Sequence, residues 1–147
     1  MPKIVKSTII NAPTGRVWDV LRDFNGHDRW HPAVTTSTIE RAQAADRVGC
    51  VRRFKLKDGS ELREQLLALS DLEQSYSYCL LDTPIALFNY VAHVRLLPVT
   101  DGDRTFWHWE SRFTTRPGDE KPMTDLVSDG IFQAGFDAIR KHLSESP

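Results

Sequence analysis

In the stretch VRRFKLKDGSELREQL, residues 51–66, polar and apolar side chains largely alternate, and the turn-forming pair Asp58-Gly59 lies at its centre. Alternation with a period of two is typical of a half-buried strand. An Asp-Gly pair between two such runs favours a tight hairpin. The stretch therefore predicts two antiparallel strands, near 48–57 and 61–71.

Strand-like runs continue on both sides of this hairpin. Their separators are short and turn-like, as at Asp101-Gly102, and short turns make neighbouring strands antiparallel. The further strands are expected at 3–11, 34–41, 74–81, 88–98 and 104–114.

Helical periodicity appears after the first strand and again at the end of the chain. Val17, Trp18 and Leu21 share one helical face, and residues 27–31 predict a second short turn. A long amphipathic helix is expected from about 121 to 143. Gly130 and Gly135 are unfavourable inside that helix, which indicates close backbone approach or a bend.

These elements predict one α+β domain over residues 1–147, a length typical of a single domain. A seven-stranded antiparallel sheet cannot cover its own apolar face, but a long terminal helix can lie across it. If the sheet curves, a cavity opens between its concave face and the helix.

The composition disfavours several classes of partner. Lys and Arg number 19 against 20 Asp and Glu, so there is little electrostatic case for nucleic acid or an anionic membrane. The longest uncharged window, 83–94, is too short for a membrane span. No apolar leader begins the chain, so a cytoplasmic protein is expected, either a monomer or a homodimer. Cys50 and Cys79 are too few for a disulfide framework.

The alternation assigns polar residues to the concave face. Arg52 shares a face with Phe54, opposite the more polar set that includes Arg53, and Glu64 shares one with Leu62. Arg52 and Glu64 are expected as cross-strand neighbours, either as a structural ion pair or as a polar anchor for a ligand. The same alternation continues through Leu66 and Ala68.

Aromatic residues dominate the inward positions of the later strands and the last helix. At least three of the four tryptophans are expected to lie against one cavity. The residues expected to bind a ligand are Trp30, His31, Arg52, Phe54, Glu64, Tyr76, Tyr78, Tyr90, Trp107, Trp109, Phe132 and Phe136.

The histidines offer weaker signals. His27 and His31 are four residues apart, but no third ligand is evident, so neither a metal nor another cofactor is expected. His31 fits either a packing role or a hydrogen-bonding role at the cavity mouth. His93 and His108 are expected as a cross-strand pair on the outer face.

Motifs along nearly the whole chain carry a family resemblance. They are Ala12-Pro13, Val17-Trp18, Asp23-Phe24, Trp30-His31-Pro32, Gly49-Cys50-Val51-Arg52, Asp58-Gly59, Glu64-Gln65-Leu66, Tyr76-Ser77-Tyr78, Asn89-Tyr90, Trp109 and Gly135-Phe136-Asp137-Ala138-Ile139. In this order they resemble the START-related, birch-pollen-allergen-like superfamily (SRPBCC), and within it the bacterial polyketide cyclase/dehydrase-like group. The resemblance implies a helix-grip fold and a pocket for lipids, polyketides or other hydrophobic small molecules.

The resemblance does not fix the chemistry, since the family includes carriers, sensors and cyclases. We expect binding of a lipid-, polyketide- or aromatic-like molecule between the sheet and the last helix. A polyketide cyclase or dehydratase is the alternative, with Glu64, Arg52, Tyr78 and His31 as its acids and bases. A ligand-responsive regulatory or stress protein, acting through a partner, is the third possibility.

Overall fold

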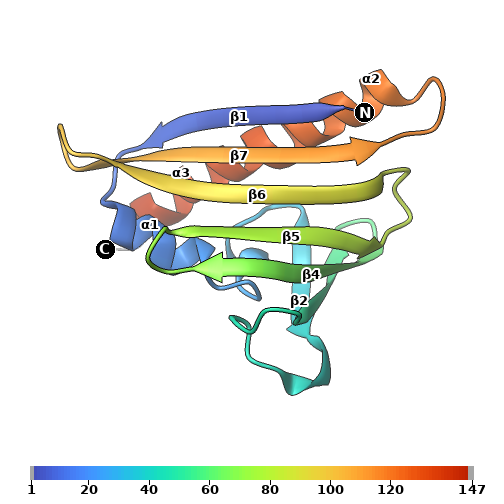
Figure 1. Ribbon diagram of the computed structural model, residues 1–147, viewed down its shortest axis with the longest axis horizontal. Coiled ribbons are helices and arrows are strands. Elements are labelled where there is room, and N and C mark those ends of the chain that lie inside the picture. The colour runs from blue at the N-terminus through green and yellow to red at the C-terminus, as the bar shows by residue number, and fades with distance from the viewer. Residues whose placement is uncertain (1, 146–147) are drawn as a thin grey trace.

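The computed structural model of the protein describes residues 2–145, and its centre is a single antiparallel sheet (Figure 1). The strand order across the sheet is β1-β7-β6-β5-β4-β3-β2, so β1 and β2 form the two edges. The strands are β1 (Lys3–Ile10), β2 (Val34–Ile39), β3 (Val51–Leu56), β4 (Glu61–Ser70), β5 (Ser75–Asp82), β6 (Phe88–Val99) and β7 (Arg104–Thr114).

The helices confirm the predicted helix-grip arrangement. A long C-terminal helix crosses one face of the sheet behind β1, β7 and β6 (Figure 1). It contains α2 (Glu120–Asp125), the π-helical segment η3 (Leu126–Gln133) and α3 (Ala134–Glu145). The shorter helices are α1 (Thr14–Leu21) and the 3₁₀ turns η1 (His27–Arg29) and η2 (Glu40–Ala42).

The central hairpin has the predicted pairing. Arg52 lies opposite Glu64 and Phe54 opposite Leu62 in the β3–β4 register. The preceding strand ends earlier than expected, at Ile39, because Arg41 has φ 59° and leaves the extended conformation.

The expected inward position of Ala68 is wrong. The register of β4 against β5 shifts between Leu66 and Ala68, which is the effect of a β-bulge. Beyond the shift, Ala68 is exposed, while Leu69 lies opposite Tyr76 and packs against the core. One extra residue thus reverses the faces over the end of the strand.

The C-terminal helix is held close to β7 by aromatic packing. The ring of Trp109 stacks on that of Phe132, with centroids 4.2 Å apart, and Trp107 meets Phe136 edge-on at 4.7 Å. A Cβ at Gly135 would lie 2.8 Å from the Trp109 ring, so the close approach expected at this glycine is present. Within residues 2–145, no helix is long and apolar enough to span a membrane.

Candidate functional site

A cavity of about 170 Å³ lies between the concave face of the sheet, η1 and the π-helical segment η3. Its walls are mostly aromatic and aliphatic, with a few polar groups. The lining residues are His27, Trp30, His31, Ala33, Val34, Arg52, Phe54, Leu56, Leu62, Glu64, Tyr76, Tyr78, Leu80, Ile85, Leu87, Tyr90, Trp109, Leu126, Gly130 and Ile131.

The polar wall of the cavity is built around one buried ion pair. Arg52 donates from Nε (3.0 Å) and Nη2 (2.7 Å) to Oε1 of Glu64, and from Nη1 (2.9 Å) to the Phe24 carbonyl. The guanidinium carbon lies 4.0 Å from the centre of the Phe24 ring, within range of a cation–π contact. Arg52 is 6% exposed and Glu64 8%, so each charge depends on the other for compensation.

Burial raises the pKa values of the carboxyl and phenol groups that line the cavity. It raises the pKa of Glu64, although the charge and hydrogen bonds of Arg52 act in the opposite direction. Burial also raises the pKa of Tyr76 to about 12, and raises those of Tyr78 and Tyr90. The three phenols are therefore protonated at neutral pH and can donate hydrogen bonds.

His31 connects the short helical turn to the C-terminal helix. Its Nδ1 accepts a hydrogen bond from the Ala33 amide (3.2 Å), and its Nε2 lies 3.3 Å from the Ile131 carbonyl. Because Nδ1 accepts and a carbonyl cannot donate, the neutral ring carries its proton on Nε2. Both nitrogens are thus engaged by the backbone, which favours the packing role over acid–base chemistry.

Eleven cavity-lining residues were not in the expected ligand-binding set, and His27 is the polar one among them. It is 7% exposed, and its ring meets the Phe54 ring edge-on at 4.6 Å. Within residues 2–145, neither of its ring nitrogens has a hydrogen-bond partner. Burial, with smaller contributions from Arg52 and His31, holds its pKa well below the ordinary value, so the ring is neutral at pH 7.

Most of the residues expected to bind a ligand line the cavity, but three do not. Trp107, Phe132 and Phe136 are packed into the core beside Trp109, at 0–1% exposure. The expected residues that line the cavity are Trp30, His31, Arg52, Phe54, Glu64, Tyr76, Tyr78, Tyr90 and Trp109.

Two of the four tryptophans line the cavity and two do not. The expectation that at least three lie against the cavity is therefore wrong. Trp30 and Trp109 line it, whereas Trp107 is core. Trp18 donates from Nε1 to Asp71 at 2.8 Å and packs on Tyr76 from α1. Alternation along a strand shows which side chains share a face of the sheet. The position of the C-terminal helix decides which of those side chains line the cavity and which are packed beneath the helix.

The outer-face histidines do not pair with each other as expected. The β6–β7 register places His93 opposite Glu110 and His108 opposite Arg95. His93 instead contacts Ser77 at 2.6 Å, and His108 contacts Glu110 at 3.2 Å. Among residues 2–145, no group of three His, Cys, Asp or Glu side chains is placed to hold a metal ion.

Comparisons with known proteins agree with this fold. A solved protein from Thermobifida fusca is 26% identical, with a TM-score of 0.86 over 99% of this chain and 95% of that one. The protein XoxI from Bacillus cereus is 23% identical, with a TM-score of 0.87 over 99% and 97%. The Zhui aromatase/cyclase from Streptomyces sp. R1128 is 17% identical, with a TM-score of 0.81 over 98% and 94%.

The family comparison covers almost the entire sequence. A family model described as polyketide cyclase / dehydrase and lipid transport matches residues 1–144. Its extent matches the single sheet-and-helix unit that encloses the cavity. The chain therefore belongs to the polyketide cyclase/dehydrase and lipid transport family, in the SRPBCC superfamily that its motifs resemble.

Proposed function

We propose that this protein binds a hydrophobic small molecule, lipid-, polyketide- or aromatic-like, in the cavity between the sheet and the C-terminal helix. The observation that carries the proposal is the cavity itself, which is walled by aromatic side chains and has a buried, internally compensated ion pair. An apolar cavity with a few converging polar groups is the usual form of a small-molecule site. Membership of a cyclase and lipid-transport family supports the same reading.

The proposal is tested with a variant in which a larger side chain fills the cavity. Leu62 and Leu67 lie on the same strand, but Leu62 lines the cavity and Leu67 is exposed. Toluene, indole and decanol are titrated into the wild type, Leu62→Phe and Leu67→Phe, with melting temperature and tryptophan fluorescence as readouts. Trp30 and Trp109 line the cavity and should report its occupancy.

We expect at least one probe to bind the wild type and Leu67→Phe, and to bind Leu62→Phe at least about tenfold more weakly, because a bulkier ring occupies the space. Equal binding to all three proteins would place the probe outside the cavity. No binding to the wild type, together with no adduct in native mass spectra of freshly purified protein, would overturn the proposal.

A cyclase or dehydratase activity is the second candidate, and the unpartnered nitrogens of His27 favour it. A general base needs a free lone pair within hydrogen-bond reach of the substrate. His27 offers one in the cavity that Glu64 also lines, whereas both nitrogens of His31 are engaged. Turnover of an added poly-β-ketone analogue that is lost in His27→Gln, while binding remains, would establish the enzyme; binding without turnover would favour the carrier.

A further inference from the structure

The cavity is small for a lipid or a multi-ring polyketide. A cavity of about 150 Å³ lined by apolar side chains holds one benzene molecule, whereas pockets for drug-sized ligands measure about 300–1,000 Å³. The volume here, about 170 Å³, corresponds to a single six-membered ring with small substituents. The size of the cavity thus sets an upper limit on the part of a ligand that it can enclose.

The cavity also offers no uncompensated charge. The positive charge of Arg52 is already paired with Glu64, and its third hydrogen bond goes to a backbone carbonyl. His27 and the three tyrosines are neutral at pH 7. A carboxylate or ammonium group on a ligand would lose its hydration and gain no free countercharge, which is costly.

Unpartnered polar groups nevertheless face or flank this space. His27 has two buried ring nitrogens without a partner among residues 2–145, one a donor and one an acceptor in the neutral ring. The indole Nε1 groups of Trp30 and Trp109, both cavity residues, are likewise buried and unpartnered in the described chain. Leaving such groups unpaired is unfavourable, so a ligand that supplies a hydrogen-bonding group gains affinity there.

We propose that the cavity is selective for an uncharged single-ring molecule with a hydroxyl substituent, a phenol, whose hydroxyl pairs with His27. A hydroxyl both donates and accepts, so it can give its hydrogen to the acceptor nitrogen of His27 and receive one from a neighbouring donor. The ring of the ligand lies among Phe54, Tyr78 and Trp109, where aromatic contacts hold it. This inference rests on the proposed function, and it names the class of ligand for the same site.

The test compares phenol with toluene, which has the same size and lacks the hydroxyl. Both are titrated at pH 7.5 into the wild type, His27→Leu and His27→Gln, with His93→Gln as the outer-face histidine control. Circular dichroism checks that each variant folds. His27→Gln keeps hydrogen-bonding groups at the position and so separates polarity from shape.

We expect the ratio of phenol affinity to toluene affinity to fall by about tenfold or more in His27→Leu, to fall less in His27→Gln, and to stay unchanged in His93→Gln. An unchanged ratio in His27→Leu, with both probes still binding, would overturn the role of His27 and leave the binding function intact. Failure of both probes to bind any of the proteins would overturn the phenol site and the binding function together.

Two further probes test charge and size in the wild type, with Leu62→Phe as the control for binding in the cavity. Benzoate, a single-ring anion only slightly larger than phenol, and estradiol, a phenol on a four-ring body, should each bind at least about tenfold more weakly than phenol. Benzoate binding as tightly as phenol would overturn the selection for an uncharged ligand. Tight estradiol binding that Leu62→Phe abolishes would overturn the single-ring limit.

Discussion

The β3–β4 hairpin carries two ionic systems, one on each of its faces. Arg52 and Glu64 point into the cavity and are almost entirely buried. Arg53, which follows Arg52, and Arg63, which precedes Glu64, point outward to a half-exposed network with Glu40. The two systems contain the same kinds of charged group one residue apart, but they differ strongly in burial.

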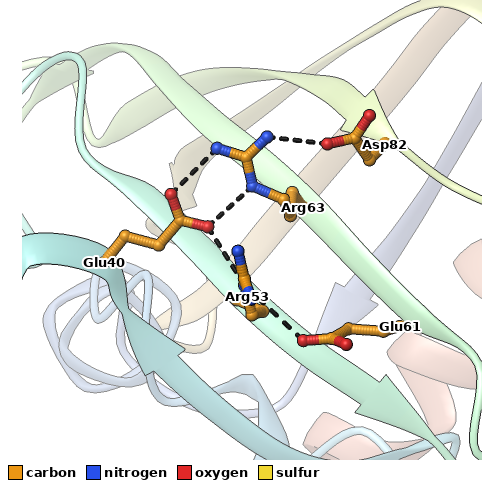
Figure 2. Close-up of polar contacts among 5 residues, drawn as sticks. All are labelled: Glu40, Arg53, Glu61, Arg63 and Asp82. Carbon is orange, nitrogen blue, oxygen red and sulfur yellow. Dashed lines mark hydrogen bonds and ion pairs between the residues drawn. The ribbon is translucent and has the colours of Figure 1, made fainter.

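Figure 2 shows how Glu40 compensates two neighbouring positive charges in the outer network. Arg53 and Arg63 lie directly opposite each other in the register, and Glu40 accepts from both. Arg63 also contacts Asp82 at 2.7 Å, and it is the main cause that lowers the pKa of Glu40 to about 2. Water and salt screen this network, whereas the inner pair is almost entirely buried and is screened much less.

The largest expected effect comes from breaking the inner pair on its acidic side. Glu64→Met leaves a buried guanidinium that cannot lose its charge, and should lower the free energy of unfolding by about 3–5 kcal/mol. Arg52→Met should cost less, since the remaining carboxyl can take up a proton, and its loss of stability relative to the wild type should shrink as the pH falls from 7 to 5. Urea denaturation measures both; a cost below about 1 kcal/mol for Glu64→Met would mean that the pair is not shielded from water.

A smaller effect is expected where the helix meets the concave face. Gly135→Ala places a methyl group 2.8 Å from the Trp109 ring, which is stacked on Phe132 and cannot move freely. We expect a loss of about 1–3 kcal/mol. Gly15→Ala in α1 meets no atom within 4 Å and should be neutral or stabilising. Equal effects of the two substitutions on the urea midpoint would contradict the close packing of the helix.

The neutral inner histidine predicts a pH dependence. The pKa of His27 is lowered in the folded protein, so between that value and about 6.5 the unfolded chain binds more protons, and stability falls as the pH decreases. Lowering the pH from 7.5 to 5.5 should cost about 1 kcal/mol through His27, which His27→Leu should remove. The lowered pKa of His31 adds a loss of the same sign that the variant retains. Thermal unfolding at the two pH values measures the difference; an equal loss in both proteins would mean that His27 is solvated.

The smallest effect is expected on the outer face. Arg63→Ala should change the free energy of unfolding by less than about 1 kcal/mol, because exposed ion pairs contribute little. The change should shrink further in 0.5 M NaCl, while the effect of Glu64→Met should not. A loss comparable to that of Glu64→Met would erase the distinction between the two faces.

The fold was largely predictable from residues whose pattern is clean. Strict alternation on both sides of Asp58-Gly59 determines the hairpin register, and with it the pairing of Arg52 and Glu64. From Leu66 to Leu69 every residue is apolar, so no alternation distinguishes inward from outward positions there. The sequence therefore could not reveal the bulge. The glycines of the last helix indicated a special region, but nothing in their spacing distinguishes a π-helical segment from a bend.

Periodicity predicted the site only where strands carry it. Arg52, Glu64 and Tyr78 follow from alternation, and all three line the cavity. His27 lies in a single 3₁₀ turn, where no periodicity assigns a direction, so its burial depends on the packing of η1 against Phe54. The available signals were its proximity in sequence to Trp30 and its four-residue spacing from His31.

A crystal of the wild-type protein under xenon pressure tests the central claim most directly, since xenon enters dry apolar cavities of this size. We expect a xenon atom between Leu62, Tyr78 and Trp109, and its loss in Leu62→Phe. Xenon found only at surface sites, or an unchanged site in Leu62→Phe, would contradict the claim that this fold encloses a ligand cavity.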